Sequence, residues 1–204
     1  MQKNKHRANL YIDGVFACGL ELQTIMQHNL KVGTSITLQE LEALQAESEL
    51  SKATEYAMGI CAKKFYTKHQ LVQKLKQKGY LDSCINQVVT KLKEYHIIDD
   101  KTFITAYMHS QQNQSKRMIL EKLKQQGVSF DMAKEAVDAI TAEEEYANAL
   151  KMAEKYVKTR KGVANMYAKS IQYVCNKGFS YDISKRAVDA VFLQQGDEIN
   201  ETWC

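Results

Sequence analysis

Proline is absent from this chain of 204 residues, and glycine occurs only nine times. Folds built from many tight turns, such as β-sandwiches and small barrels, depend on these residues, so their scarcity favours a mostly helical protein. The chain also lacks any uncharged apolar run near the roughly 20 residues that a membrane-spanning helix needs. Its basic start, Met1–Arg7, leads into polar, alternating sequence and excludes a signal-peptide core. We therefore expect a cytoplasmic protein with no membrane segment.

Paired cysteines are also lacking. The five cysteines are odd in number and widely scattered, and none forms a Cys-x-x-Cys pair. This pattern indicates neither a disulfide framework nor a zinc site. We expect most of them to be small buried side chains in a reducing compartment. They are Cys18, Cys61, Cys84, Cys175 and Cys204.

The composition is otherwise that of an ordinary globular protein, with 45% hydrophobic and 25% charged residues. The net charge of +4 is unevenly distributed. Residues 1–50 carry four basic and six acidic side chains, residues 51–140 carry fifteen and nine, and residues 141–204 carry nine of each. The positive charge therefore lies in the middle of the chain and indicates an acidic partner.

The N-terminal segment predicts a β-hairpin. Residues 8–20 alternate with period two, with Leu10, Ile12, Phe16 and Cys18 as the larger apolar members. Asp13-Gly14 supplies the positive φ angles of a tight turn between two short strands. A short helix is expected over residues 21–28. A second should begin after Thr37, with Glu40 at the capping-box position, and run through Leu38, Leu41 and Leu44.

From residue 51 onward the chain repeats itself with a period of about 50 residues. Gly127–Ile140 and Gly178–Val191 are identical at eight of fourteen positions, at an offset of 51. A weaker copy ends its second helix at Gly79. Self-similarity at such a period indicates stacked supersecondary units.

Each repeat predicts three helices. In the first repeat, residues 51–64 form one helix, Thr67 caps a second with Gln70 at the capping-box position, and Asp82 starts a third. Gly79 ends the second helix. In the later repeats Asp99-Asp100 and Ser115 are helix starts, as is the run of acids at residues 143–145. The expected fold is all-α, with tandem three-helix repeats in an elongated curved array preceded by a small N-terminal β-hairpin. The expected parts are an N-terminal hairpin with short helices (1–50), three repeats (51–98, 99–141 and 142–193) and a polar C-terminal tail (194–204).

This arrangement resembles the RecX family, the bacterial regulators of the RecA recombinase. The resemblance is carried by the hairpin segment Asn9–Ala17, by Ile98–Phe103 between the first two repeats, by Leu120–Val128, and by Lys177–Phe179 in the third repeat. Together these segments span most of the chain. The resemblance implies a monomeric, non-enzymatic regulator that docks into the groove of a RecA–DNA filament. It also implies inhibition of ATP hydrolysis and strand exchange in homologous recombination, DNA repair and the SOS response.

The residues offer no catalytic constellation. The sequence contains no Gly-x-x-x-x-Gly-Lys phosphate loop, no dinucleotide-binding glycine motif and no histidine pair with metal-ligand spacing. Asp99-Asp100 is better read as a helix start than as a Mg²⁺ site, and Cys61 and His69 as packing residues than as a nucleophile and base. We expect no catalytic residue, no metal and no cofactor, and hence no ATP hydrolysis by the pure protein.

Basic clusters are the sharpest functional signal. Eight lysines lie between residues 63 and 93, against Asp82 as the only acid. Stacked repeats would align these helices with the basic helix of the second repeat into one ridge that fits an acidic groove or a phosphate backbone. The tyrosines of the first two repeats are expected to pack between helices. The residues assigned to the ridge are Lys63, Lys64, Lys68, Lys74, Lys78, Lys116, Arg117 and Lys122.

Two functions fit this ridge. The first is docking onto a RecA filament, as the family resemblance implies. The alternative is a helical module that binds single- or double-stranded DNA directly, with weak affinity. The two differ experimentally, because protein docking requires the recombinase, whereas binding to DNA alone shows a steep dependence on salt.

Overall fold

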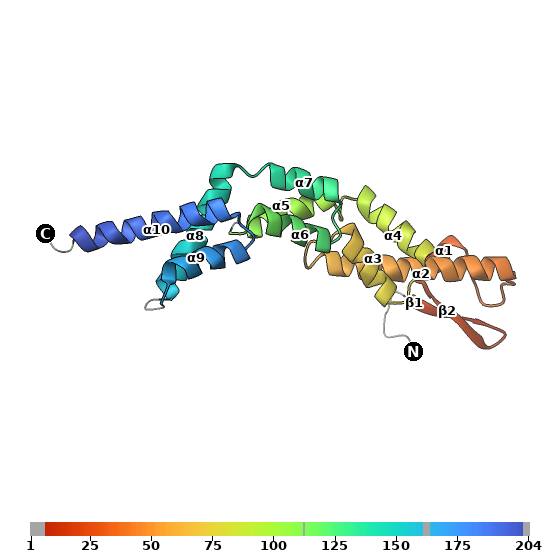
Figure 1. Ribbon diagram of the computed structural model, residues 1–204. Helices are drawn as coiled ribbons and strands as arrows, with labels where there is room; N and C mark the ends of the chain where they lie inside the picture. The colour runs from red at the N-terminus through yellow and green to blue at the C-terminus, as the bar shows by residue number, and fades with distance from the viewer. Residues whose placement is uncertain (1–6, 112, 161–163, 202–204) are drawn as a thin grey trace. The chain divides into compact units, whose positions relative to one another are not determined.

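The computed structural model describes residues 7–111, 113–160 and 164–201, with side chains described as far as residue 194 (Figure 1). Contacts between Cα atoms divide the chain into two compact units, residues 1–99 and 100–204. Unit 1 contains β1 (Arg7–Ile12), β2 (Val15–Glu21), α1 (Leu22–Gln27), α2 (Leu38–Cys61), α3 (Lys68–Gln77) and α4 (Asp82–Glu94). Unit 2 contains α5 (Asp100–Ser110), α6 (Lys116–Gln125), α7 (Phe130–Asp138), α8 (Ala142–Thr159), α9 (Met166–Asn176) and α10 (Tyr181–Glu201).

The predicted hairpin and the three three-helix repeats are confirmed. The repeats are α2 to α4, α5 to α7 and α8 to α10. Each has its own apolar core, centred on Leu71 and Leu75 in the first, Ile119 and Leu123 in the second, and Val174 in the third. One glycine with positive φ follows the second helix of every repeat, namely Gly79, Gly127 and Gly178. The repeated glycine therefore marks a repeated helix end.

The hairpin differs from the predicted alternation at one residue. Asp13 and Gly14 have φ angles of +48° and +81° and make the expected tight turn. Leu10 pairs with Cys18 but Tyr11 pairs with Phe16, so β2 carries one extra residue at Ala17. This bulge turns Phe16 away from the inner face, and its ring packs edge-on against Tyr11 on the exposed side. The prediction that Phe16 lies among the inward-facing residues was wrong.

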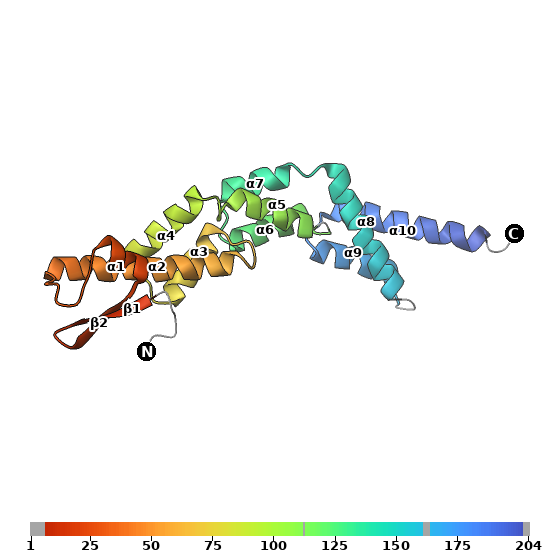
Figure 2. The same ribbon diagram turned by 180° about the vertical axis from the view of Figure 1, so that it is seen from behind.

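The hairpin packs on the N-terminal half of α2, as both Figure 1 and Figure 2 show. Cys18, Leu20 and Leu44 form a small core of their own there. The guanidinium of Arg7 donates to the carbonyl oxygen of Gly19 and to the hydroxyl of Ser48, at 3.1 and 3.2 Å. These bonds fix the first strand to a helix that also belongs to the first repeat.

One helix replaces the two that the sequence predicted around residue 50. Thr37 caps α2 through a capping box with Glu40, as expected, and the backbone N–H of Thr37 holds the pKa of the Glu40 carboxyl below its usual range. The helix then runs unbroken to Cys61. Residues 45–50 contain neither glycine nor proline and are mostly strong helix formers, so nothing stops the helix there. The boundary placed at residue 50 therefore falls inside α2, and Lys63 and Lys64 lie beyond its end.

Two details of the third repeat also differ from expectation. Asn165, the residue before α9, has φ of +56° and makes no side-chain cap bond, whereas Thr67 and Ser115 cap α3 and α6 with their hydroxyls. The α10 helix continues to Glu201, into the segment expected to be a polar tail. Lys161, expected to close the first helix of this repeat, and Cys204 lie outside the described residues.

Candidate functional site: two basic surfaces

The first basic surface belongs to unit 1, and we call it the α3 patch. It consists of Lys63, Lys64, Lys68, Lys74 and Lys78, all exposed. Leu71 and Leu75 have no exposed surface and hold α3 against α4 and α2. The Thr67 hydroxyl accepts from the backbone N–H of Gln70 and fixes where α3 begins. The apolar face of α3 therefore orients its lysines toward solvent.

Aromatic rings support two lysines of the α3 patch. The ammonium of Lys64 lies 4.5 Å from the ring centre of Tyr66, and that of Lys78 lies 5.3 Å from the ring centre of Tyr56. Both distances are in the range of cation–π attraction. Tyr56 and Tyr66 are half-buried, as the packing role predicted for them requires. The rings restrict the motion of these two cations without neutralising them.

No acidic residue interrupts the sequence around the α3 patch. Residues 56–81 contain six lysines and no aspartate or glutamate. The sixth, Lys76, forms an ion pair with Asp82 at 3.0 Å. A surface with one sign of charge and no intervening carboxylates raises the local concentration of an acidic partner and speeds its association.

The second basic group lies in unit 2, at the start of α6. Arg117 is exposed, and Lys116 and Lys122 are half-buried. Ser115 caps this helix, and its hydroxyl also donates to the backbone carbonyl oxygen of Lys177 at 2.9 Å. The backbone N–H of Lys116 donates to a carboxylate oxygen of Glu145 at 3.4 Å. The two groups belong to different units, and their union in one ridge stays a prediction.

Sequence reasoning missed a third set of cations in the third repeat. It counted residues 141–204 as neutral, yet residues 155–181 contain six basic residues and no acid. Three of these residues, Arg160, Lys169 and Lys177, are exposed in the described structure. A charge count over windows of about 25 residues, in place of whole repeats, would have found them.

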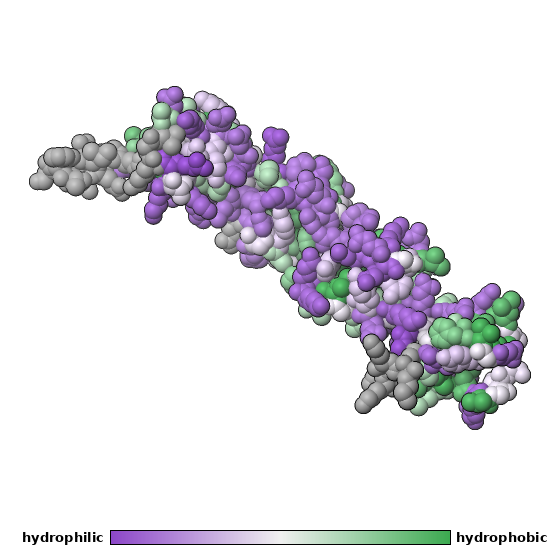
Figure 3. Space-filling view, turned by 90° about the horizontal axis from the view of Figure 1, so that it is seen from below, coloured by the Kyte–Doolittle hydropathy of each residue, from purple (hydrophilic) through white to green (hydrophobic). Residues whose placement is uncertain are grey.

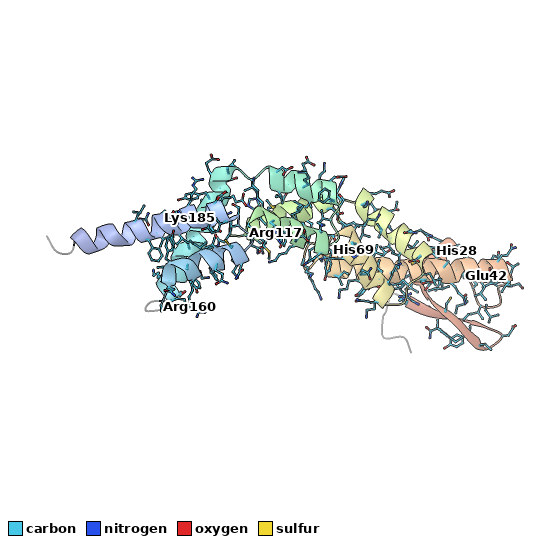
Figure 4. The ribbon with its side chains drawn as sticks, viewed as in Figure 1. His28, Glu42, His69, Arg117, Arg160 and Lys185 are labelled. Carbon is cyan, nitrogen blue, oxygen red and sulfur yellow. The ribbon has the colours of Figure 1, made fainter. Side chains whose placement is uncertain are left out.

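The described structure provides no grouping of catalytic type. Within it, no three histidine, cysteine or acidic side chains are placed to hold a metal ion. His69 is exposed on α3, and Figure 4 shows its position there. Burial raises the pKa of the Cys61 thiol, which lowers the fraction of reactive thiolate at neutral pH. These observations agree with packing roles for both residues.

Cys61 should therefore react slowly with alkylating reagents. In the folded protein at pH 8, we expect iodoacetamide to modify Cys61 several-fold more slowly than the same cysteine in a synthetic peptide of residues 58–64, because the buried thiol ionises at higher pH. Mass mapping of proteolytic peptides after timed alkylation between pH 7 and pH 9.5 measures both rates. A Cys61 that ionises at or below the pH of the peptide would contradict this assignment.

Hydrophobic side chains are exposed mainly at the hairpin end of unit 1, where Figure 3 shows them gathered. Tyr11, Val15, Phe16, Met26 and Val32 are all more than half exposed. A depression of about 730 Å³ lies between β1 and residues 31–36. In the described part of the chain, no helix is both long and apolar enough to cross a membrane.

Comparisons with known proteins place this fold and its basic helices in one family. Residues 1–37 match the model of the regulatory protein RecX N-terminal domain, and residues 53–92 match that of the first three-helix domain of RecX. The chain is 30% identical over 192 residues to the regulatory protein RecX of Clostridium botulinum strain Alaska E43, covering 92% of this chain and 91% of that protein. The chain belongs to the RecX family. A second RecX, from Clostridium tetani, is 27% identical and covers 96% of this chain and 93% of that protein.

Solved RecX structures share the fold. A crystal structure of regulatory protein RecX superposes with a TM-score of 0.71 at 24% identity, over 92% of this chain and 95% of that one. The structure of RecX from Lactobacillus salivarius gives a TM-score of 0.61 at 23% identity, over 71% of this chain and 97% of that one. The family named from the hairpin and repeat motifs is thus confirmed. The relatives are named regulatory proteins, which agrees with the lack of a catalytic grouping in the described residues.

Proposed function

We propose that this RecX-family chain is a non-enzymatic, monomeric regulator of the RecA recombinase. It binds the RecA–DNA filament in its groove and inhibits ATP hydrolysis and strand exchange during recombination and DNA repair. The α3 patch is the surface that carries this proposal, because it presents five exposed lysines on a helix anchored by two fully buried leucines. Its partner is then an acidic protein surface or the phosphates of the filament.

Charge contributes to such docking through the rate of encounter. Complementary charges raise association rates strongly at low salt, and the effect falls as salt shortens the Debye length. The α3 patch supports this mode of binding because its cations lie beyond a rigid apolar anchor and two of them rest on tyrosine rings. The Lys116, Arg117 and Lys122 group on α6 is the second contact that we assign to the filament.

Reversing three charges of the α3 patch should abolish inhibition. We expect the variant Lys63→Glu, Lys68→Glu, Lys74→Glu to keep its helical content and melting temperature, since exposed substitutions usually change stability by about 0.5 kcal/mol or less each. It should lose inhibition of RecA-driven ATP hydrolysis, with a milder loss at low salt, where the remaining cations act over a longer distance. Steady-state ATP hydrolysis by RecA on single-stranded DNA is the measurement.

A matched control lies in the same unit. Lys31→Glu, Lys52→Glu, Lys93→Glu makes the same change in net charge at exposed positions outside the α3 patch. It also pairs a loop lysine and a last-turn lysine with those of the test variant. This control should inhibit like the parent. Equal inhibition by parent and test variant at every salt concentration would remove the α3 patch from the proposal.

A further inference from the structure

The third repeat carries a regular row of cations on α9. Lys169, Tyr173 and Lys177 follow one another at intervals of four residues, so they lie along one side of the helix, and both lysines are exposed. The eight residues from Lys169 to Lys177 span about 12 Å along the helix axis. We call Arg160, Lys169 and Lys177 the α9 stripe.

Stacked tyrosines support the α9 stripe from below. The ring of Tyr173 stacks on that of Tyr156 from α8, with 4.3 Å between ring centres and 23° between ring planes. The ammonium of Lys177 lies 5.2 Å from the centre of Tyr173, and the guanidinium of Arg160 lies 6.0 Å from the centre of Tyr156. Cations held in this way lose less side-chain entropy on binding than free ones.

The α9 stripe is not consumed by internal ion pairs. In the residues that the structure describes, none of its three cations lies in a salt bridge, whereas Lys124, Lys134 and Lys185 of the same unit each contact a carboxylate. The sequence from 155 to 181 supplies no acid that could pair with them. Such uncompensated charge requires a negatively charged partner or solvent.

The row continues onto α6 at its upper end. The bond from the Ser115 hydroxyl to the Lys177 carbonyl oxygen brings the start of α6 against the end of α9. Arg117 therefore lies near Lys177, and Figure 4 shows Arg117 on α6 and Arg160 at the far end of α8. One acid, Glu145, lies at this junction, where it accepts from the backbone N–H of Lys116.

We propose that the α9 stripe is a binding surface for the phosphate backbone of duplex DNA. A strand of the duplex presents one phosphate per 3.4 Å of axis, so the roughly 12 Å of the row faces about three or four phosphates. A regular, rigid row of cations fits such a regular row of charges better than it fits scattered carboxylates of a protein. Single-stranded DNA is disfavoured because its binding uses free aromatic faces, and Tyr156 and Tyr173 are stacked on each other.

This surface is independent of the proposed docking through the α3 patch. Its three residues lie outside both groups that we assign to the RecA filament, and its test contains no recombinase. Failure of duplex binding would leave inhibition by the α3 patch untouched, and failure of inhibition would leave duplex binding untouched.

The salt dependence of duplex binding tests the proposal. The full chain is titrated into a fluorescently labelled 30-base-pair duplex of mixed sequence, without RecA, between 50 and 200 mM salt. The test variant is Arg160→Gln, Lys169→Gln, Lys177→Gln. Because each phosphate contact adds about 0.9 to the slope of log affinity on log salt, the variant should lose about 2.7 of slope. Over this fourfold salt range the affinity of the parent should therefore fall about 40-fold more than that of the variant.

The control variant Lys124→Gln, Lys134→Gln, Lys185→Gln makes the same charge change in the same unit at cations already held in ion pairs. It should keep the parental slope. If the triple test variant loses helical content, Lys169→Gln alone decides, since this side chain supports no other described contact; its slope should fall by about 0.9. Equal slopes for parent and test variants, an equal loss in the control, or tighter stripe-dependent binding to a single strand or to polyglutamate would each overturn the proposal.

Discussion

Replacing Gly178 with alanine should be the most damaging single methyl addition in unit 2. Gly178 has φ of +90°, and an added Cβ would lie 2.5 Å from the Ser115 hydroxyl oxygen and 2.8 Å from Cγ of Met118. A left-handed backbone costs a residue with a side chain about 1–2 kcal/mol. Crowding in a packed interior adds about 1–3 kcal/mol. We therefore expect Gly178→Ala to lower the free energy of unfolding by about 2–5 kcal/mol.

Gly79 separates the two causes. It occupies the same place in the first repeat, with φ of +85°, but nothing lies within 4 Å of an added Cβ. Gly79→Ala should therefore show only the backbone cost of about 1–2 kcal/mol. Urea denaturation of both variants, followed by far-ultraviolet circular dichroism, compares them. Equal losses would mean that the second and third repeats yield around Ser115 without cost.

Truncating Leu75 should destabilise unit 1 by about 2–5 kcal/mol, the range for a buried leucine changed to alanine. Its side chain has no exposed surface and lies in the core that α3 shares with α2 and α4. The neighbouring Lys74 is exposed, so Lys74→Ala should change the free energy of unfolding by about 0.5 kcal/mol or less. Chemical denaturation of the two variants measures both values.

The same pair of variants distinguishes positioning from contact in the α3 patch. Leu75→Ala leaves every lysine in place but loosens the helix that carries them, so inhibition of RecA should weaken as temperature approaches the lowered melting point. Lys74→Ala should weaken inhibition equally at all temperatures below melting. A Leu75→Ala protein with unchanged stability would mean that α3 is not held by the core described for it.

Features fixed by neighbouring residues were predictable from the sequence. The capping boxes at Thr37 and Thr67 and the glycine after each second helix depend on side chains and φ angles within one turn. The bulge at Ala17 was not predictable from period-two alternation, because it shifts the pairing of two strands that the sequence shows only separately. The unbroken α2 was missed because helix starts were sought at each change of pattern.

The site divides in the same way. Exposure of the α3 patch followed from the spacing of Leu71 and Leu75, since buried leucines orient the rest of a helix. The aromatic support of Lys78 by Tyr56 brings together two helices and could not be read from either. The α9 stripe was hidden because acids at both ends of the third repeat cancel its charge in a whole-repeat count.

The unbroken α2 also decides where this protein can be cut and joined. Its first half carries the hairpin through Leu44 and Ser48, and its second half carries the first repeat through Ala53 and Ala57. At about 36 Å it is one rod serving two cores. A chimera joined at residue 50 would sever that rod and strand both halves. Residues 7–99 are instead the smallest N-terminal piece that can be exchanged between relatives as a whole.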